Sequence, residues 1–338
     1  MLPILSRYTM TLALLSVVAL LMTACIPQPT VQPTTAPPET PTGAAQGLSV
    51  VVTYSILGDL VQQVAGDRVA LTVLVGAEGD PHTYQPTPRD SATIGAATLI
   101  FENGLEFESW LDDIFVASGS QATRVPVSTG VTPLAAAKEE HGHGEEEHSE
   151  EEHSEEEHSH GEFDPHIWQD PINAQAMVVV IRDALITADP DNRATYTANA
   201  AAYTTELQAL DSFIREQVAT LPAERRKLVT NHDTFAYFAN RYGFEVIGTA
   251  LGRSTESTDP SAGAIRELVE QIRAAAVPAI FTENTVNPAL METIAREAGV
   301  TLAPALFTDA LGASDSAGAT YLEMMRFNAT TIVSNLAK

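Results

Sequence analysis

DNRATYTANAAAYTTELQALDSFIREQVATL, residues 191–221, forms one uninterrupted helical pattern. The stretch contains no Gly and no Pro, the two residues that most often interrupt a helix. Thirty-one helical residues at a rise of about 1.5 Å each extend about 46 Å, which is longer than one small domain. We therefore predict that 191–221 is a helix that links two lobes.

Short strand patterns alternate with helical patterns on both sides of this helix, and such alternation predicts parallel βα units. Before the linking helix, the predicted strands are LSVVVTY (48–54), Val69–Val75 and TLIFENG (98–104), and a helix is predicted over 173–188. After Pro222, the predicted strands are KLVT (227–230), FEVIGTA (244–250), PAIFT (278–282) and TLAPALF (301–307). We expect an α/β fold in which two Rossmann-like lobes, 48–190 and 222–338, are joined by one long helix.

The N-terminal segment has the features of a bacterial lipoprotein precursor. Residues 10–24 form an apolar run that is too short to span a bilayer comfortably, and Arg7 is the only positive charge before it. The run ends in LMTAC, which resembles a lipobox, although Met22 stands where Leu is usual, and Cys25 is the only cysteine. We predict a signal peptide over 1–25 and a lipid anchor on Cys25. A simple secretory signal and a tethering helix are the alternatives.

Residues 26–47 are rich in Pro, Thr, Ala and Gln, a composition that cannot bury enough apolar surface to fold. We predict a disordered tether that holds the folded part at the outer face of the bacterial cytoplasmic membrane, in the periplasm or outside the cell. The single cysteine also excludes an intrachain disulfide bond.

The chain is acidic, with a formal net charge of -26. This charge argues against nucleic acid as a partner, because phosphates require a basic surface. Much of the acidic excess lies in a low-complexity insert, 138–163, which contains three tandem copies of EEEHS at 145–159. We predict a mobile loop here. Imidazole is largely unprotonated at neutral pH, so we expect weak auxiliary zinc binding by the six histidines of the insert: His141, His143, His148, His153, His158 and His160.

Two of the three histidines outside the insert lie in a repeated motif, DPHTYQ (80–85) and DPHIWQ (164–169). A lone His is more often a satisfied surface or core residue than a ligand, but two copies of Asp-Pro-His-x-aromatic-Gln favour a metal-binding role for His82 and His166. Proline fixes the backbone just before each imidazole, which suits a ligand that is held in place before the metal arrives.

His232 and Asp309 each follow a predicted strand. The carboxyl ends of strands are where open α/β sheets bind their ligands. For Asp309, a helix N-cap is an equally good interpretation of the position taken alone. Three imidazoles and one carboxylate, all expected at strand ends of the two lobes, make a four-ligand set that suits a borderline divalent cation.

Six segments, in order from about Leu48 to the C-terminus, are similar to the zinc/manganese-binding receptors of bacterial metal ABC importers: GDPHTYQPTPRD, LIFENGLEFESWL, DPHIWQDP, VTNHDTFAYFANRYG, STESTDPSAGAIREL and FTDALG…GATYLEMMRFN. The resemblance implies two lobes bridged by a rigid helix, with the metal in the cleft between them. It implies His82, His166, His232 and Asp309 as ligands, a membrane permease as partner and no enzymatic activity. Gln85 departs from the Glu of many relatives. We also expect a monomer.

The ligand types favour Zn²⁺ over Mn²⁺, because three imidazoles form a softer set than two imidazoles and two carboxylates. The His-rich insert, common in the zinc-specific branch of the resembling family, favours the same metal. A manganese receptor of that family is the first alternative. A zinc hydrolase is the enzymatic alternative, with water in place of Asp309 and Glu283 as general base. The remaining alternative is a surface adhesin or a metal buffer that works without an importer.

Overall fold

The computed structural model describes residues 47–136, 161–252, 255 and 260–338. The predicted signal peptide, nearly all of the predicted tether and the six histidines of the insert therefore lie outside the described residues. Of the insert, only residues 161–163 are described. Phe163 pairs with Ala135 in an isolated antiparallel bridge, so the residue at the predicted end of the loop is part of an ordered base.

The N-terminal lobe is built on a parallel four-stranded sheet in the order β2-β1-β3-β4. Side chains along β1 alternate between two hydrophobic clusters, because successive strand residues point to opposite faces. Val50 and Val52 face the larger cluster with α1 and α4, whereas Val51 and Ile100 face a smaller cluster with α2 and α3. The strands are β1 (Leu48–Tyr54), β2 (Val69–Val75), β3 (Leu99–Glu102) and β4 (Thr123–Pro126), and the helices are α1 (Ser55–Ala65), α2 (Pro88–Gly95) and α3 (Leu111–Ser118).

The sequence predicted β1 and β2 with the bounds that the structure shows, and it did not predict β4 or α3. β4 (TRVP) has only four residues, of which Thr123 is exposed and the other three are partly buried, so it carries no clear hydrophobic pattern. α3 is one short helix of eight residues, and its two buried side chains are Leu111 and Ile114. Such short elements are defined by packing against β3 and α2, which a local pattern does not contain.

The C-terminal lobe contains two parallel strand pairs, β5 with β6 and β7 with β8. β5 packs beside β7, so the carboxyl ends of strands from both pairs lie close together. The strands are β5 (Lys227–Thr230), β6 (Glu245–Thr249), β7 (Ala279–Glu283) and β8 (Thr301–Leu306), and the helices are α6 (Ala236–Tyr242), α7 (Ala262–Ala275), α8 (Ala289–Ala298) and α9 (Tyr321–Leu336). Short 3-10 turns occur at Val127–Gly130, Ile167–Gln169, Pro190–Asn192 and Ala223–Arg225.

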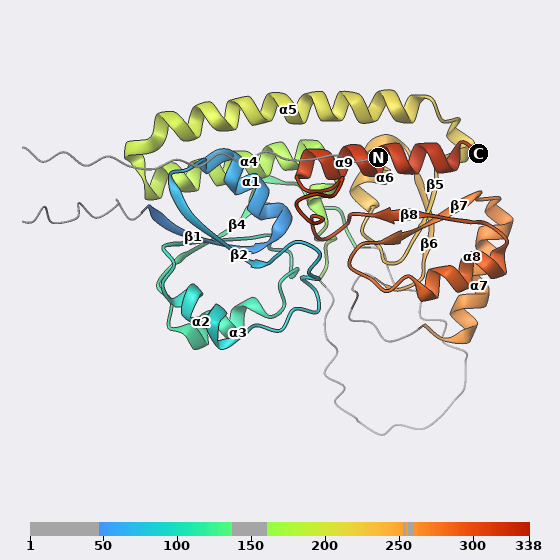
Figure 1. Ribbon diagram of the computed structural model, residues 1–338, viewed down its shortest axis with the longest axis horizontal. Coiled ribbons are helices and arrows are strands. Elements are labelled where there is room, and N and C mark those ends of the chain that lie inside the picture. Colours follow the sequence, from blue (N-terminus) through green and yellow to red (C-terminus); the bar gives the residue numbers. More distant parts are fainter. Residues whose placement is uncertain (1–46, 137–160, 253–254, 256–259) are drawn as a thin grey trace, which may run out of the picture. The chain divides into compact units, whose positions relative to one another are not determined.

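One long helix, α5 (Arg193–Ala219), joins the lobes as predicted (Figure 1). Its 27 residues extend about 40 Å. At each end, the helix is two residues shorter than the predicted helix. A buried stripe with a spacing of three or four residues runs along α5: Tyr196, Ala200, Tyr203, Leu207, Leu210, Ile214 and Val218. This stripe packs on α1 and α4 at one end and on α9 at the other. The helix is therefore supported by both lobes.

By length and composition alone, helix α4 (Pro171–Ala188) could span a membrane, and it is the only such helix within the described residues. It packs on α1 and α5, and Met177, Ile181 and Leu185 are fully buried, so it is a core helix.

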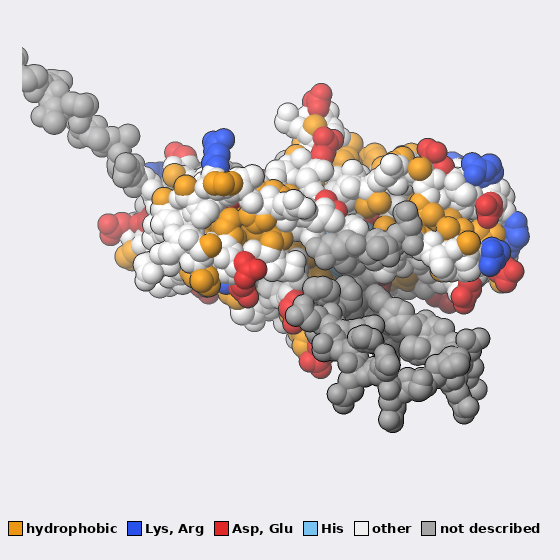
Figure 2. Space-filling model, turned by 90° about the horizontal axis from the view of Figure 1, so that it is seen from below, with side chains coloured by type: hydrophobic (Ala, Val, Ile, Leu, Met, Phe, Trp, Pro, Cys, Tyr) orange, Lys and Arg blue, Asp and Glu red, His pale blue; other side chains and the backbone are white. Residues whose placement is uncertain are grey.

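On the face shown in Figure 2, Lys and Arg side chains at the C-terminal-lobe end lie among Asp and Glu side chains.

Candidate metal centre

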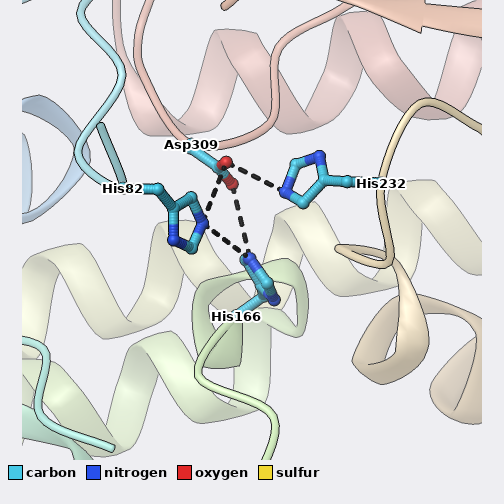
Figure 3. Close-up of side chains that lie close together, drawn as sticks. All are labelled: His82, His166, His232 and Asp309. Carbon is cyan, nitrogen blue, oxygen red and sulfur yellow. Dashed lines mark hydrogen bonds and ion pairs between the residues drawn. The ribbon is translucent and has the colours of Figure 1, made fainter. Parts of the chain in front are cut away.

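Four buried side chains from separate segments converge on one point, as Figure 3 shows: His82, His166, His232 and Asp309. One nitrogen or oxygen atom of each lies within 4.8 Å of the others. Asp309 Oδ2 is 3.0 Å from His232 Nε2 and 3.5 Å from His82 Nε2. Asp309 Oδ1 is 3.8 Å from His166 Nε2, and the Nε2 atoms of His82 and His166 are 3.3 Å apart. The structure thus brings together all four residues that the sequence singled out.

Three of the four residues follow strands, as the sequence predicted. His82 lies in the loop after β2, His232 lies just after β5 and Asp309 follows β8. His166 was expected at a strand end, and that expectation is wrong: it precedes the 3-10 turn Ile167–Gln169 and helix α4. The N-cap interpretation of Asp309 is also wrong, because the next helix, α9, begins at Tyr321 and is capped by Thr320.

The repeated Asp-Pro-His motif forms the same turn twice. Asp80 Oδ1 accepts the backbone N–H of His82, and Asp164 Oδ1 accepts that of His166, both at 2.9 Å. In the second copy, Asp164 Oδ1 also lies 2.7 Å from His166 Nδ1, which turns Nε2 toward the centre. In the first copy, the other oxygen of Asp80 accepts from Thr255 Oγ1 at 2.6 Å.

The second halves of the two motifs diverge. Trp168 and Gln169 are fully buried and donate to the carbonyl oxygen of Thr308, next to Asp309. Their counterparts in the first copy lie toward the surface, where Tyr84 donates to Asp90 and Gln85 is exposed. The Gln of the motif therefore supports the metal centre only in the second copy.

Glu283, the last residue of β7, contacts His232 twice. Its Oε1 accepts the backbone N–H of His232 at 2.9 Å, and its Oε2 lies 2.5 Å from His232 Nδ1. The sequence suggested Glu283 as a general base of a hydrolase, but its carboxylate is engaged with a candidate ligand. The sequence signal available was its position at the end of a predicted strand; the packing of that strand beside β5 is seen only in the structure.

Opposite charges stabilise one another inside the centre. Burial alone would lower the pKa of His232, but the carboxylates of Glu283 and Asp309 outweigh it and raise that pKa well above its usual value. Burial would raise the pKa of Asp309, but His232 above all, with His82 and His166, holds it well below its usual range. His232 Nε2 lies 3.0 Å from Asp309 Oδ2, and His232 Nδ1 lies 2.5 Å from Glu283 Oε2, but neither ring nitrogen makes an aligned hydrogen bond among the described residues. Both contacts are therefore ion pairs of buried groups, and a cation at the centre would bind Nε2 and Oδ2 together.

Aromatic rings enclose the imidazoles. Phe107 packs edge-on against His82 and His166, with ring centroids 4.8 and 6.0 Å apart, and Trp168 packs against His166 at 5.4 Å. An apolar shell of this kind limits solvent access and fixes the orientation of the ligands. Among the described residues, this is the one group of three or more His, Cys, Asp or Glu side chains with the proximity that metal binding requires.

Comparisons with known proteins agree with this geometry. Residues 50–335 match the family described as ZnuA, zinc-uptake complex component A periplasmic. The chain is 35% identical over 293 residues to the manganese-binding lipoprotein MntA of Halalkalibacterium halodurans, and the matched region covers 87% of this chain and 90% of MntA. It is 32% identical over 287 residues to the zinc-binding lipoprotein AdcA of Streptococcus pneumoniae, which covers 83% of this chain and 54% of AdcA.

Solved structures include the periplasmic zinc binding protein TroA from Treponema pallidum, with a TM-score of 0.75 and 32% identity over 86% of this chain and 100% of TroA. The family consists of solute-binding proteins for metal transport and not of enzymes, so the hydrolase alternative is wrong. With a family match over most of its length, the chain belongs to the ZnuA family of extracytoplasmic, metal-binding receptors of ABC importers.

Proposed function

We propose that this chain captures Zn²⁺ outside the cytoplasm with His82, His166, His232 and Asp309, and delivers it to the permease of an ABC importer. The main observation in support of this proposal is the convergence of three imidazole nitrogens and one carboxylate oxygen in a buried centre. Nε2 of His232 and Oδ2 of Asp309 support the same assignment, because these two buried atoms lie 3.0 Å apart without an aligned hydrogen bond and a divalent cation would bind both.

Zinc is favoured over manganese on the chemistry of the donors. Imidazole nitrogen is a softer ligand than carboxylate oxygen, and Zn²⁺ accepts four such donors without further ligands. A manganese receptor is the second candidate, because MntA of H. halodurans is named as manganese-binding.

Affinity in vitro favours zinc over manganese at most sites of this kind, so affinity alone does not identify the cargo. The first measurement is the metal content of the protein purified without added metal. The second is the accumulation of each metal by cells that carry either the wild-type protein or His232→Ala. We expect the variant to lower zinc accumulation. A loss of manganese accumulation with normal zinc accumulation identifies a manganese receptor instead.

The same proposal covers the attachment of the receptor. Cys25 carries the lipid anchor, residues 26–47 form the tether, and the receptor acts as a monomer whose lobes, 48–190 and 222–338, are linked through 191–221. Its relatives MntA and AdcA are named as lipoproteins, which supports the anchor. Mass spectrometry of the membrane-bound protein tests it, and Cys25→Ser should release the protein from the membrane. A variant that stays attached contradicts the anchor on Cys25.

A further inference from the structure

We infer that Glu283 is a positioning residue that assembles the C-terminal half of the metal site by holding His232 and the Asp309 loop together. The inference rests on the proposed function, because it assigns a task to a residue beside the proposed ligands. Glu283 is 2% exposed, and its carboxylate contacts residues that follow β5 and β8. Its place at the end of β7 allows it to reach ligand loops on both sides.

The contacts of Glu283 reach both C-terminal ligand loops. Toward His232, Oε1 accepts the backbone N–H and Oε2 lies 2.5 Å from the ring Nδ1. Toward the Asp309 loop, Oε2 accepts the hydroxyl of Thr308 at 3.1 Å. Because Nδ1 faces Glu283, the opposite nitrogen of the ring, Nε2, faces Asp309. One carboxylate therefore fixes the direction of the imidazole and the position of the neighbouring loop.

The next residue, Asn284, strengthens this link with three hydrogen bonds. Asn284 N–H donates to the carbonyl of Leu306 at 2.9 Å, and its side-chain oxygen accepts from Thr308 N–H at 3.1 Å. Its side-chain N–H donates to the carbonyl of Ala310 at 3.2 Å. The backbone is thus held before and after Asp309 by the end of β7. The C-terminal half of the site is organised within its own lobe.

The N-terminal lobe contains a matching arrangement. Asp164 contacts both the backbone N–H and the ring Nδ1 of His166, as Glu283 does for His232. Asp164 precedes its histidine by two residues, whereas 51 residues separate His232 from Glu283. Each lobe thus supplies one buried carboxylate that orients one imidazole. Loss of such a partner typically lowers metal affinity about 10–100-fold.

Glu283→Gln tests the inference, because it keeps the size of the side chain and removes its charge and one acceptor oxygen. The matched control is Glu102→Gln. Glu102 is also the last residue of a parallel strand, is 6% exposed and has both oxygens engaged, but by Arg124 and not by a candidate ligand. Zn²⁺ affinity is measured by chelator competition, and the visible spectrum of bound Co²⁺ reports the coordination, since four-coordinate Co²⁺ absorbs more strongly than six-coordinate Co²⁺.

We expect Glu283→Gln to bind Zn²⁺ about 10–100-fold more weakly. It should also lose Co²⁺ absorption, because a misaligned His232 lets additional waters bind and raises the coordination number of Co²⁺ above four. Glu102→Gln should retain the wild-type affinity and spectrum. Wild-type affinity and spectrum in Glu283→Gln, or equal losses in both variants, overturn the inference alone. A wild-type protein that takes up no stoichiometric Zn²⁺ overturns the proposed function as well.

Thr308→Val provides a second variant should Glu283→Gln fail to fold. It removes the hydroxyl that Glu283 Oε2 accepts and leaves the volume of the side chain nearly unchanged. We expect a several-fold loss of Zn²⁺ affinity in a protein that still folds. An unchanged affinity overturns the link between Glu283 and the Asp309 loop.

Discussion

The indole N–H of Trp168 donates to the carbonyl oxygen of Thr308 at 2.8 Å, and this bond joins the two lobes beside the metal centre. Trp168 follows the candidate ligand His166 closely, and Thr308 directly precedes Asp309. The hydroxyl of Tyr321 adds a bond to the carbonyl oxygen of Trp168 at 2.6 Å. These groups are buried, so separating the lobes would leave polar atoms without partners.

Metal release should therefore proceed with small movements of the lobes and loops. Helix α5 packs on both lobes, and the bonds around Trp168 hold the ligand segments of opposite lobes near each other without metal. We expect nearly equal radii of gyration for the metal-free and zinc-bound proteins in small-angle X-ray scattering. A hinge opening as wide as that of sugar receptors would contradict this prediction while leaving the metal site in place.

Replacement of a single histidine ligand should weaken zinc binding severely. His82→Ala or His232→Ala leaves three of the four candidate donors, and the loss should exceed the about 10–100-fold expected when only an outer partner is removed. Asp309→Ala should be milder, because water can occupy the vacated position on Zn²⁺. Calorimetric titration of each variant measures these effects. Parent-like affinity in both histidine variants would mean that the site assignment is wrong.

The sequence predicted those parts of the site that follow local rules. His232 and Asp309 were found because both follow strands. His82 and His166 were found because each belongs to a turn that three consecutive residues, Asp-Pro-His, form. Glu283 was assigned a wrong role because its contact with His232 depends on β5 packing beside β7, which no local pattern encodes. His166 was misplaced because it lies before a 3-10 turn and helix α4 and not after a strand.

Deletion of 139–162 should remove weak zinc binding and leave one strong equivalent. Described residues on the two sides of 139–162 lie side by side, because Ala135 pairs with Phe163 and the N–H of Asp164 donates to the carbonyl of Leu134 at 3.0 Å. The deletion can therefore be closed with a short linker. A zinc titration of both proteins makes the comparison. Loss of the strong equivalent would mean that the insert supplies a primary ligand.

The electrostatics of His232 determine how zinc affinity depends on pH. A metal ligand must be neutral imidazole, so a proton on His232 competes with the metal. Burial opposes this proton, but Glu283 and Asp309 outweigh burial and raise the pKa of His232 well above its usual value in the metal-free protein. An unperturbed histidine has a pKa of about 6.5. A proton on His232 therefore competes with the metal at a higher pH than a proton on an ordinary histidine would.

Zinc binding should release a proton from His232, and the apparent affinity should fall with decreasing pH over a range that lies above the range expected for an ordinary histidine. The direction follows because the raised pKa places proton competition at higher pH than an ordinary histidine would. Calorimetry in buffers of different ionisation enthalpy counts the released protons, and the protein without 139–162 serves as the control that excludes the insert histidines. Binding without proton release, and an affinity that stays constant down to about pH 6.5, would show that His232 is already neutral in the metal-free protein.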